Sequence, residues 1–127
     1  MAIKYKIVTR KNPQDFEAAP KYYAQLVYEG KDNTQTLARE IALSTTMGKA
    51  DVIGVLIALG DIVGQHLAMG RNVDLLDLCI LSPSITSTGA ASEAEFNVKT
   101  NIKRVGVNIR AKRNLVEAVA KAGLQKA

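Results

Sequence analysis

The chain has 127 residues, 47% of them hydrophobic, and a net charge of +5 from 17 basic and 12 acidic residues. This length suits one ordinary domain and is enough to bury about two-thirds of the surface that the unfolded chain exposes. The single cysteine, Cys79, excludes an intrachain disulfide and favours a reducing compartment. With only one histidine as well, the composition excludes a Cys/His metal cluster and a Cys–His–acid triad. We therefore expect a cytoplasmic protein that is not an enzyme and uses no metal, cofactor or small-molecule substrate.

The first 33 residues indicate an extended hairpin with a wide loop. Ile3, Tyr5 and Ile7 alternate with lysines, which is the period of a half-buried strand. Residues 12–15 (NPQD) break this pattern, and a second alternation follows over residues 22–28 before Gly30.

Most of the aromatic residues lie in this first segment. Tyr22, Tyr23 and Tyr28 could stack single-stranded bases, with Lys4, Lys6 and Lys21 beside them. The alternative, which we favour, is that the tyrosines supply the core of the hairpin or cover a partner's surface.

Two helices are predicted next. Thr34 is a plausible N-cap for a short helix that stops at residues 45–48 (TTMG). Asp51 then lies in the first turn of a second helix, where its charge favours the positive end of the helix dipole, and Gly70 ends that helix.

The second helix is too apolar to be covered by its short neighbour. We expect its apolar face to form a subunit interface in a homodimer. The residues chosen for this interface are Val52, Val55, Leu56, Leu59, Ile62 and Val63. The apolar run from Val52 to Gly60 is interrupted by Asp61, so we expect no membrane span.

The remainder of the chain predicts strands, a long reversing loop and a last helix. Residues 73–81 are rich in strand formers, and residues 82–92 are predicted to be a mobile loop. Apolar residues alternate over 96–102 and again over 105–109, with a change of phase that predicts a bulge near Lys103. Helical spacing resumes over 115–122, and Gly123 is a natural C-cap.

The positive charge is concentrated near the C-terminal end. Residues 99–113 contain six basic residues and no acid, and such a one-signed field attracts polyanions. A bland alternative is a solvated strand face with ordinary solubility charges. The candidate DNA-binding residues are Lys99, Lys103, Arg104, Arg110, Lys112 and Arg113, with Lys4, Lys6, Arg10 and Lys11 as a second patch.

The order of elements and three short motifs resemble the bacterial histone-like HU and integration host factor family. Residues 47–52 (MGKADV) are similar to that family's Leu-Ser-Lys-Lys-Asp-Ala turn between helices. Residues 70–75 (GRNVDL) are similar to its Gly-x-x-Val-x-Leu start of the first strand. Residues 109–115 (IRAKRNL) are similar to the Phe-Lys-Ala-Gly-Lys-x-Leu that precedes its last helix. The first 33 residues resemble an extended HU-like subgroup.

The resemblance implies an α+β, intertwined dimer. Each subunit would have a β-hairpin extension (1–33), an HU-like DNA-binding domain (34–123) and a tail (124–127). Within the domain we expect two N-terminal helices, antiparallel strands with a short arm, and a C-terminal helix. The implied function is low-specificity binding of double-stranded DNA in the bacterial nucleoid, through phosphate neutralisation and minor-groove shape contacts.

Two departures from the family limit this expectation. The family's Gly-Phe-Gly at the first strand turn is replaced by residues 77–79 (DLC), which lack the glycines that permit a tight bend. The expected arm has Pro83 at its base and Glu93 and Glu95 near its end, so it lacks the basic tip and apolar wedge needed for intercalation. The alternative function is therefore an HU-fold protein–protein assembly module that has lost DNA binding.

Overall fold

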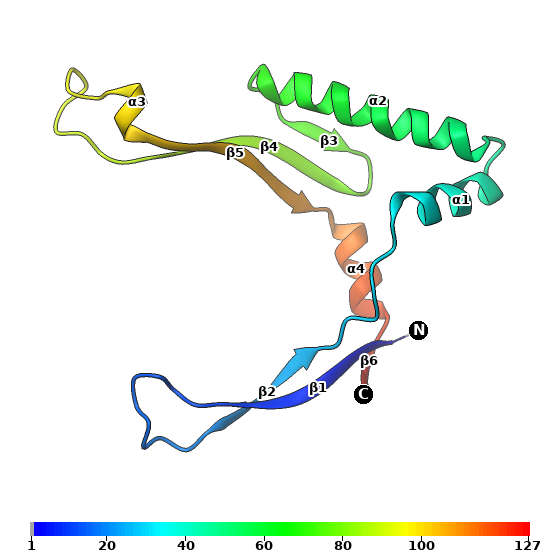
Figure 1. Ribbon diagram of the computed structural model, residues 1–127, viewed down its shortest axis with the longest axis horizontal. Helices are drawn as coiled ribbons and strands as arrows, with labels where there is room; N and C mark the ends of the chain where they lie inside the picture. The colour runs from blue at the N-terminus through cyan, green and yellow to red at the C-terminus, as the bar shows by residue number, and fades with distance from the viewer. Residues whose placement is uncertain (1) are drawn as a thin grey trace. The chain divides into compact units, whose positions relative to one another are not determined.

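The computed structural model describes residues 2–127, which form four helices and six strands in two three-stranded sheets (Figure 1). This confirms the α+β class. The elements in chain order are β1 (Ile3–Arg10), β2 (Lys21–Leu26), α1 (Thr34–Ser44), α2 (Lys49–Ala68), β3 (Val73–Leu75), β4 (Cys79–Ser87), α3 (Val98–Asn101), β5 (Ile102–Ala111), α4 (Arg113–Lys121) and β6 (Leu124–Lys126).

Backbone contacts divide the chain differently from the sequence prediction. Residues 33–115 form one compact unit, and residues 116–127 belong with residues 1–32 in the other. The expected tail is not free, because residues 124–126 form β6, which pairs in parallel with β1. The Ile3 N–H donates to the carbonyl of Gly123 (3.0 Å), and the Ala127 N–H donates to that of Tyr5 (2.9 Å).

The N-terminal sheet has the strand order β2-β1-β6. The expected hairpin is confirmed: β1 and β2 pair antiparallel from Tyr5–Leu26 to Arg10–Lys21. Strand alternation divides this sheet into an apolar face, with Tyr5 and Tyr22, and a basic face, with Lys6 and Arg10.

The two central helices form with one correction at the N-terminus of α1. The N-cap is Asn33, not Thr34, because the Asn33 side chain accepts from the Thr36 N–H (3.0 Å). At the start of α2, the Gly48 N–H donates to the Asp51 carboxylate (3.2 Å), as expected of an acid in the first turn. Gly70 takes a left-handed φ of 79° just after α2, which explains why the helix ends there.

The second sheet has the order β3-β4-β5. The predicted strand over 73–81 is broken at residues 76–78, where the Leu78 N–H donates to the carbonyl of Leu75 (2.9 Å). The bend therefore forms without the family's glycines, with Leu76 in the left-handed region at φ 46°. That conformation costs a non-glycine residue about 1–2 kcal/mol.

The expectation of a mobile loop over 82–92 is wrong in its first half, since β4 continues to Ser87 and pairs with β5. Pro83 is tolerated there because β3 pairs only with residues 79–81, so beyond Leu81 one edge of β4 has no partner strand.

The strand expected over 96–102 is also wrong. Local side-chain hydrogen bonds hold this segment in a turn and the short α3. The Asn97 side chain accepts from the Lys99 N–H (2.9 Å), and the Asn101 side chain accepts from the Asn97 N–H (2.8 Å). Asparagine side chains of this kind compete with strand formation.

The bulge predicted near Lys103 is confirmed. Thr86 pairs with Arg104 and Ser87 pairs with Ile102, so Lys103 is the extra residue on β5. The helix predicted over 115–122 is present as α4, and Gly123 follows it with φ 78°.

Candidate nucleic-acid interface

The long pairing of β4 with β5, here called the ribbon (residues 79–87 and 102–111), has one polar face and one apolar face. Side chains on paired strands share a face at opposed positions and alternate along the strand. The polar face carries Arg104, Gly106, Asn108 and Arg110 on β5, opposite Thr86, Ser84, Ser82 and Ile80 on β4. Within the ribbon it therefore combines two guanidinium groups with small hydrogen-bonding side chains and has no acid, while on the neighbouring β3 the same face carries Asp74, which is paired with Ile80.

The opposite ribbon face is apolar and mostly exposed. It carries Leu81, Pro83, Ile85, Val105, Val107 and Ile109. Leu81 and Pro83 are half-buried, and α2 contacts β4, whereas Val105 and Ile109 are 74% and 69% exposed. Valine and isoleucine in a strand normally pack against a second layer, so the exposed part of this face is suited to a partner.

The ribbon brings together four of the predicted DNA-binding residues. Arg104 and Arg110 lie on the polar face, roughly 20 Å apart along the strand. Lys103 occupies the bulge beside Arg104, and Lys99 lies in α3 at the outer end of the ribbon. All four side chains are on one exposed, continuous stretch of the unit formed by residues 33–115.

The last two residues of the predicted run lie at the inner end of the ribbon and have other interactions. The Lys112 ammonium group is 2.5 Å from the carboxylate of Asp74 on β3, and its backbone N–H donates to the carbonyl of Leu78. Arg113 begins α4 and also has a bonding partner. No sequence pattern indicated that Asp74 partly neutralises Lys112.

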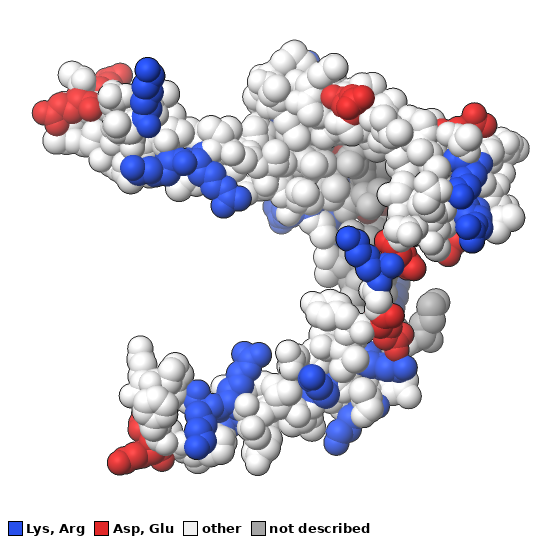
Figure 2. Space-filling model, in the orientation of Figure 1, with Lys and Arg blue, Asp and Glu red and all other residues white. Residues whose placement is uncertain are grey.

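The outer end of the ribbon is acidic, as expected. Thr88 and Asn101 close the neck of the connecting loop: the Thr88 N–H donates to the Asn101 carbonyl (2.8 Å), and the Asn101 amide donates to the Thr88 hydroxyl (3.2 Å). The loop beyond them holds Glu93 and Glu95 and no basic residue up to Asn97. Figure 2 shows basic side chains along the ribbon and acidic ones at its tip.

Lys4 and Lys6 of the second predicted patch lie on the basic face of the N-terminal sheet, in the other unit. Glu29 is 2.6 Å from the Lys4 ammonium group, and its hydrogen bond and charge raise the pKa of Lys4 above the usual 10.5. Both side chains of this pair are largely exposed, so solvent screens their interaction.

Two further basic residues lie on this face. Arg10, predicted for the second patch, and Lys21, predicted beside the tyrosines, are directly paired across β1 and β2 and lie on the same side as Lys6. The tyrosines do not form a core: Tyr22 and Tyr28 are 71% and 84% exposed.

Four of the six predicted interface residues of α2 are exposed, while Val63 is half-buried and Val52 is buried. Val55 and Ile62 are both more than half exposed, and Leu56 and Leu59 more than a third. Val52 is buried inside the subunit, as is Ala38 on α1, so it supports the packing of α1 on α2 and does not contribute surface for a partner.

Taken alone, α2 has the length and composition of a membrane span. It has 20 residues and a mean hydropathy of 1.5, and only 6% of the most apolar window is buried. Asp61 therefore does not exclude a membrane span by composition, contrary to the sequence argument. An exposed apolar helix of this kind needs a cover, either another protein surface or lipid.

Among residues 2–127, no three His, Cys, Asp or Glu side chains gather in a geometry suited to a metal ion.

The chain matches the family model of an HU domain fused to a wHTH, Ig or glycine-rich motif over residues 1–126. A search of the curated proteins finds no match.

Among solved structures, the fold is similar to a protein of Bacteroides vulgatus ATCC 8482 whose printed description is "putative bacterial DNA binding protein". The TM-score is 0.70 at 16% identity, and the match covers 98% of this chain and 47% of that one. The chain thus spans about half the length of this neighbour, and the likeness concerns the fold alone.

Because the family model covers nearly the whole chain and the fold agrees with it, this protein belongs to the family of HU domains fused to wHTH, Ig or glycine-rich motifs.

Proposed function

We propose that the protein binds double-stranded DNA with little sequence specificity, as a homodimer, in the bacterial nucleoid. The observation that carries this proposal is the polar face of the ribbon, where Arg104 and Arg110 alternate with small hydrogen-bonding side chains and no acid intervenes. The family membership and the description of the solved neighbour support DNA as the partner.

The ribbon suits contact with the DNA backbone. Guanidinium groups bind phosphate oxygens in a bidentate manner, while serine, threonine and asparagine donate single hydrogen bonds to phosphates and sugars. Such contacts position a protein on the duplex but carry no direct sequence information. The ribbon therefore acts by neutralising phosphates and matching the shape of the groove.

A dimer would double this surface. The uncovered apolar face of α2 and the apolar face of the ribbon both require a cover, which a second copy of the chain supplies. If each subunit neutralises about five phosphates, the slope of log K against log salt for the dimer is about −9.

The acidic tip argues for binding without sharp kinking. Wedge-type bending needs an apolar side chain inserted between base steps. Glu93 and Glu95 near the end of the loop would instead be repelled by the phosphates. The proposed architectural role is therefore to coat and stiffen DNA, not to fold it sharply.

The test is a fluorescence-anisotropy titration of several unrelated 20-base-pair duplexes at a series of salt concentrations. Replacing Arg104 and Arg110 with alanine should weaken binding to every duplex alike and reduce the salt slope by about 4 for a dimer. The control is Arg39→Ala, which removes a cation from α1 in the same unit but outside the ribbon. A salt slope near zero for the wild type, or a loss confined to one sequence, contradicts the proposal.

A second candidate function is a protein–protein assembly module with the same dimer fold. The acidic tip and the ion pair that engages Lys112 favour it, because both reduce the field available to DNA. A folded dimer that fails to shift duplex DNA at micromolar concentration and moderate salt would support the assembly module over DNA binding.

A further inference from the structure

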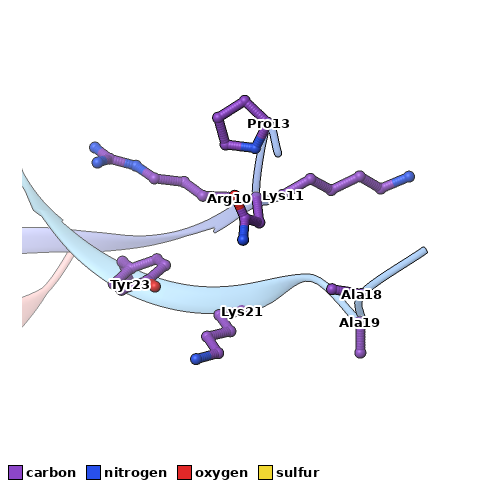
Figure 3. A pocket seen from close by; sticks show the side chains of 8 residues that line it. Arg10, Lys11, Pro13, Ala18, Ala19, Lys21 and Tyr23 are labelled. Carbon is purple, nitrogen blue, oxygen red and sulfur yellow. The ribbon is translucent and has the colours of Figure 1, made fainter. Parts of the chain in front are cut away.

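The outer end of the N-terminal hairpin contains an open cavity of about 530 Å³. It lies where β1 leaves the sheet and β2 enters it, and its lining comes entirely from residues 10–23. Figure 3 shows Arg10 and Tyr23 from the two strands and Pro13, Ala18 and Ala19 from the connecting loop. The volume falls within the range of about 300–1,000 Å³ that is typical of small-ligand sites.

The charge in this cavity is all of one sign. Arg10, Lys11 and Lys21 line it, and no acid does. The acids of the same loop, Asp15 and Glu17, are outside the lining, and the Asp15 carboxylate accepts from the Glu17 N–H (3.1 Å). The cavity therefore attracts an anion.

The rest of the lining is Asn12 and four side chains with apolar surfaces. Pro13 lines the cavity from the β1 side, and Ala18 and Ala19 line it from the β2 side (Figure 3). The loop between them is held by the Asn12 side chain accepting from the Gln14 N–H (3.0 Å) and by the Ala18 N–H donating to the Asp15 carbonyl (3.4 Å). The phenol ring of Tyr23 forms another part of the lining. Cations beside flat apolar groups fit a ligand that joins a phosphate to a planar base.

Arg10 and Tyr23 act as a pair. The Arg10 guanidinium carbon is 5.8 Å from the centre of the Tyr23 ring, within the range of a cation–π contact. The contact holds the flat guanidinium group at the edge of the cavity. In this position a base can stack on its free plane, and a phosphate oxygen can accept from its N–H edge.

We infer that this hairpin cavity binds nucleotides of a single-stranded nucleic acid. A base must be unpaired to enter the cavity, since a duplex keeps its bases stacked inside. The backbone of the same strand would follow the basic face of the sheet from Arg10 toward Lys6, about 13 Å away along β1. Base stacking combined with a basic track is the usual mode of sequence-tolerant single-strand binding.

This inference does not rest on duplex binding by the ribbon. The cavity belongs to the unit that contains residues 1–32, whereas the ribbon belongs to the unit of residues 33–115. The two surfaces can therefore be tested separately in the full chain.

The experiment compares a fluorescein-labelled dT15 oligonucleotide with an abasic oligonucleotide of the same length and charge. The wild type should bind dT15 about tenfold more tightly, because the abasic strand lacks the bases that stack. The double variant Arg10→Ala/Lys21→Ala should lose about tenfold in affinity for dT15. Arg10→Lys keeps the charge but not the planar group, so it should lose most of the preference for dT15 over the abasic strand.

Two matched controls define the site. Lys126→Ala removes a cation from the opposite face of the same sheet, because Lys126 is paired with Tyr5, and should change dT15 affinity by less than twofold. Arg104→Ala/Arg110→Ala should weaken duplex binding but leave the preference for dT15 over the abasic strand intact. Circular dichroism confirms that each variant is folded.

Three results would overturn the inference. Equal affinity for dT15 and the abasic strand would mean that charge alone is bound. Loss of dT15 binding in the ribbon variant, but not in the hairpin variant, would move the site to the ribbon. Competition by dTMP or by a duplex as effective as that by unlabelled dT15, at equal nucleotide concentration, would assign the cavity to a free nucleotide or to double-stranded DNA.

Discussion

The ribbon and the N-terminal sheet both place basic side chains on one face of antiparallel strands and apolar side chains on the other. They differ in the neighbours of the cations. On the ribbon, Arg104 and Arg110 are accompanied by serine, threonine and asparagine, whereas Arg10 on the N-terminal sheet is stacked on Tyr23. Charge alone makes both faces attractive to polyanions, and the neighbouring groups distinguish a surface for backbone contacts from one that can also hold a base.

On both faces, a carboxylate partly neutralises the charge of one lysine. Each has one lysine at its inner end that is paired with a carboxylate, Lys112 with Asp74 and Lys4 with Glu29. The Lys112 side chain is 27% exposed and the Lys4 side chain 44% exposed, so the first pair is screened less by solvent. The field of each face is therefore weaker at that end than the sequence suggests.

The largest expected effect comes from the apolar face of α2, through which we propose that the dimer forms. Leu59→Asp/Ile62→Asp should abolish the dimer, because four buried charges would have to be desolvated in the interface. Loss of bivalency should then reduce duplex affinity by at least about 100-fold. Light scattering after size exclusion measures the mass, and anisotropy measures the affinity.

The conservative variant Leu59→Met/Ile62→Val is the control and should remain dimeric. If the aspartate variant stays dimeric and keeps its DNA affinity, α2 is not the interface. If instead the wild type partitions with lipid vesicles and is monomeric in their absence, the exposed helix is covered by a membrane.

The next effect concerns the ribbon tip and separates the two candidate functions. Glu93→Lys/Glu95→Lys should raise duplex affinity about tenfold and steepen the salt slope, because cations replace acids near the DNA. Glu93→Gln/Glu95→Gln should give a smaller gain in the same direction. No gain in either variant, measured by the same anisotropy titration, would mean that the tip does not approach DNA and would favour an assembly role.

The elements that repeat a pattern over several residues were predictable from the sequence. The hairpin of β1 and β2, the helices α1, α2 and α4, and the bulge at Lys103 all follow from periodicity or from its interruption. β6 was missed because its three residues are too few to show alternation, and its pairing with β1 is a contact between the two ends of the chain. The segment 96–102 alternated like a strand, but Asn97 and Asn101 fix it locally in a turn.

The candidate sites show the same limit. The basic residues of 99–113 could be recognised in the sequence as a run without acids. Which of them lie on the polar face of the ribbon and which at its inner end could be known only from the register of β4 against β5. The partner of Lys112 was not predictable, since Asp74 reaches it only through the packing of β3 on β4. The hairpin cavity was equally hidden, because its lining depends on how the loop between β1 and β2 is folded.

A smaller effect tests how far the ion pair with Asp74 weakens the contribution of Lys112 to DNA binding. Asp74→Asn removes the carboxylate that is 2.5 Å from Lys112 and should raise duplex affinity about two- to threefold at low salt, with the gain lost at high salt. Asp77→Asn is the matched control, because it changes the net charge equally but leaves the Lys112 pair intact. Equal gains in the two variants would show that only net charge matters and that the pairing of Lys112 is irrelevant to binding.

The smallest effect is expected at the corresponding pair of the N-terminal sheet. Glu29 raises the pKa of Lys4 above 10.5, so the pair contributes stability at neutral pH that is lost only as the pH rises through the raised pKa. In Glu29→Gln this alkaline loss should disappear, and the melting temperatures of variant and wild type should converge once the pH is high enough to deprotonate Lys4. Freeing Lys4 from its ion pair with Glu29 should raise dT15 affinity by less than twofold. Because Lys4 is protonated from pH 6 to 9 in both proteins, this gain should not depend on pH in that range. Glu17→Gln, in the hairpin loop, is the control for the change in net charge. A pH-dependent gain between 6 and 9 would mean that a group other than Lys4 titrates at this face.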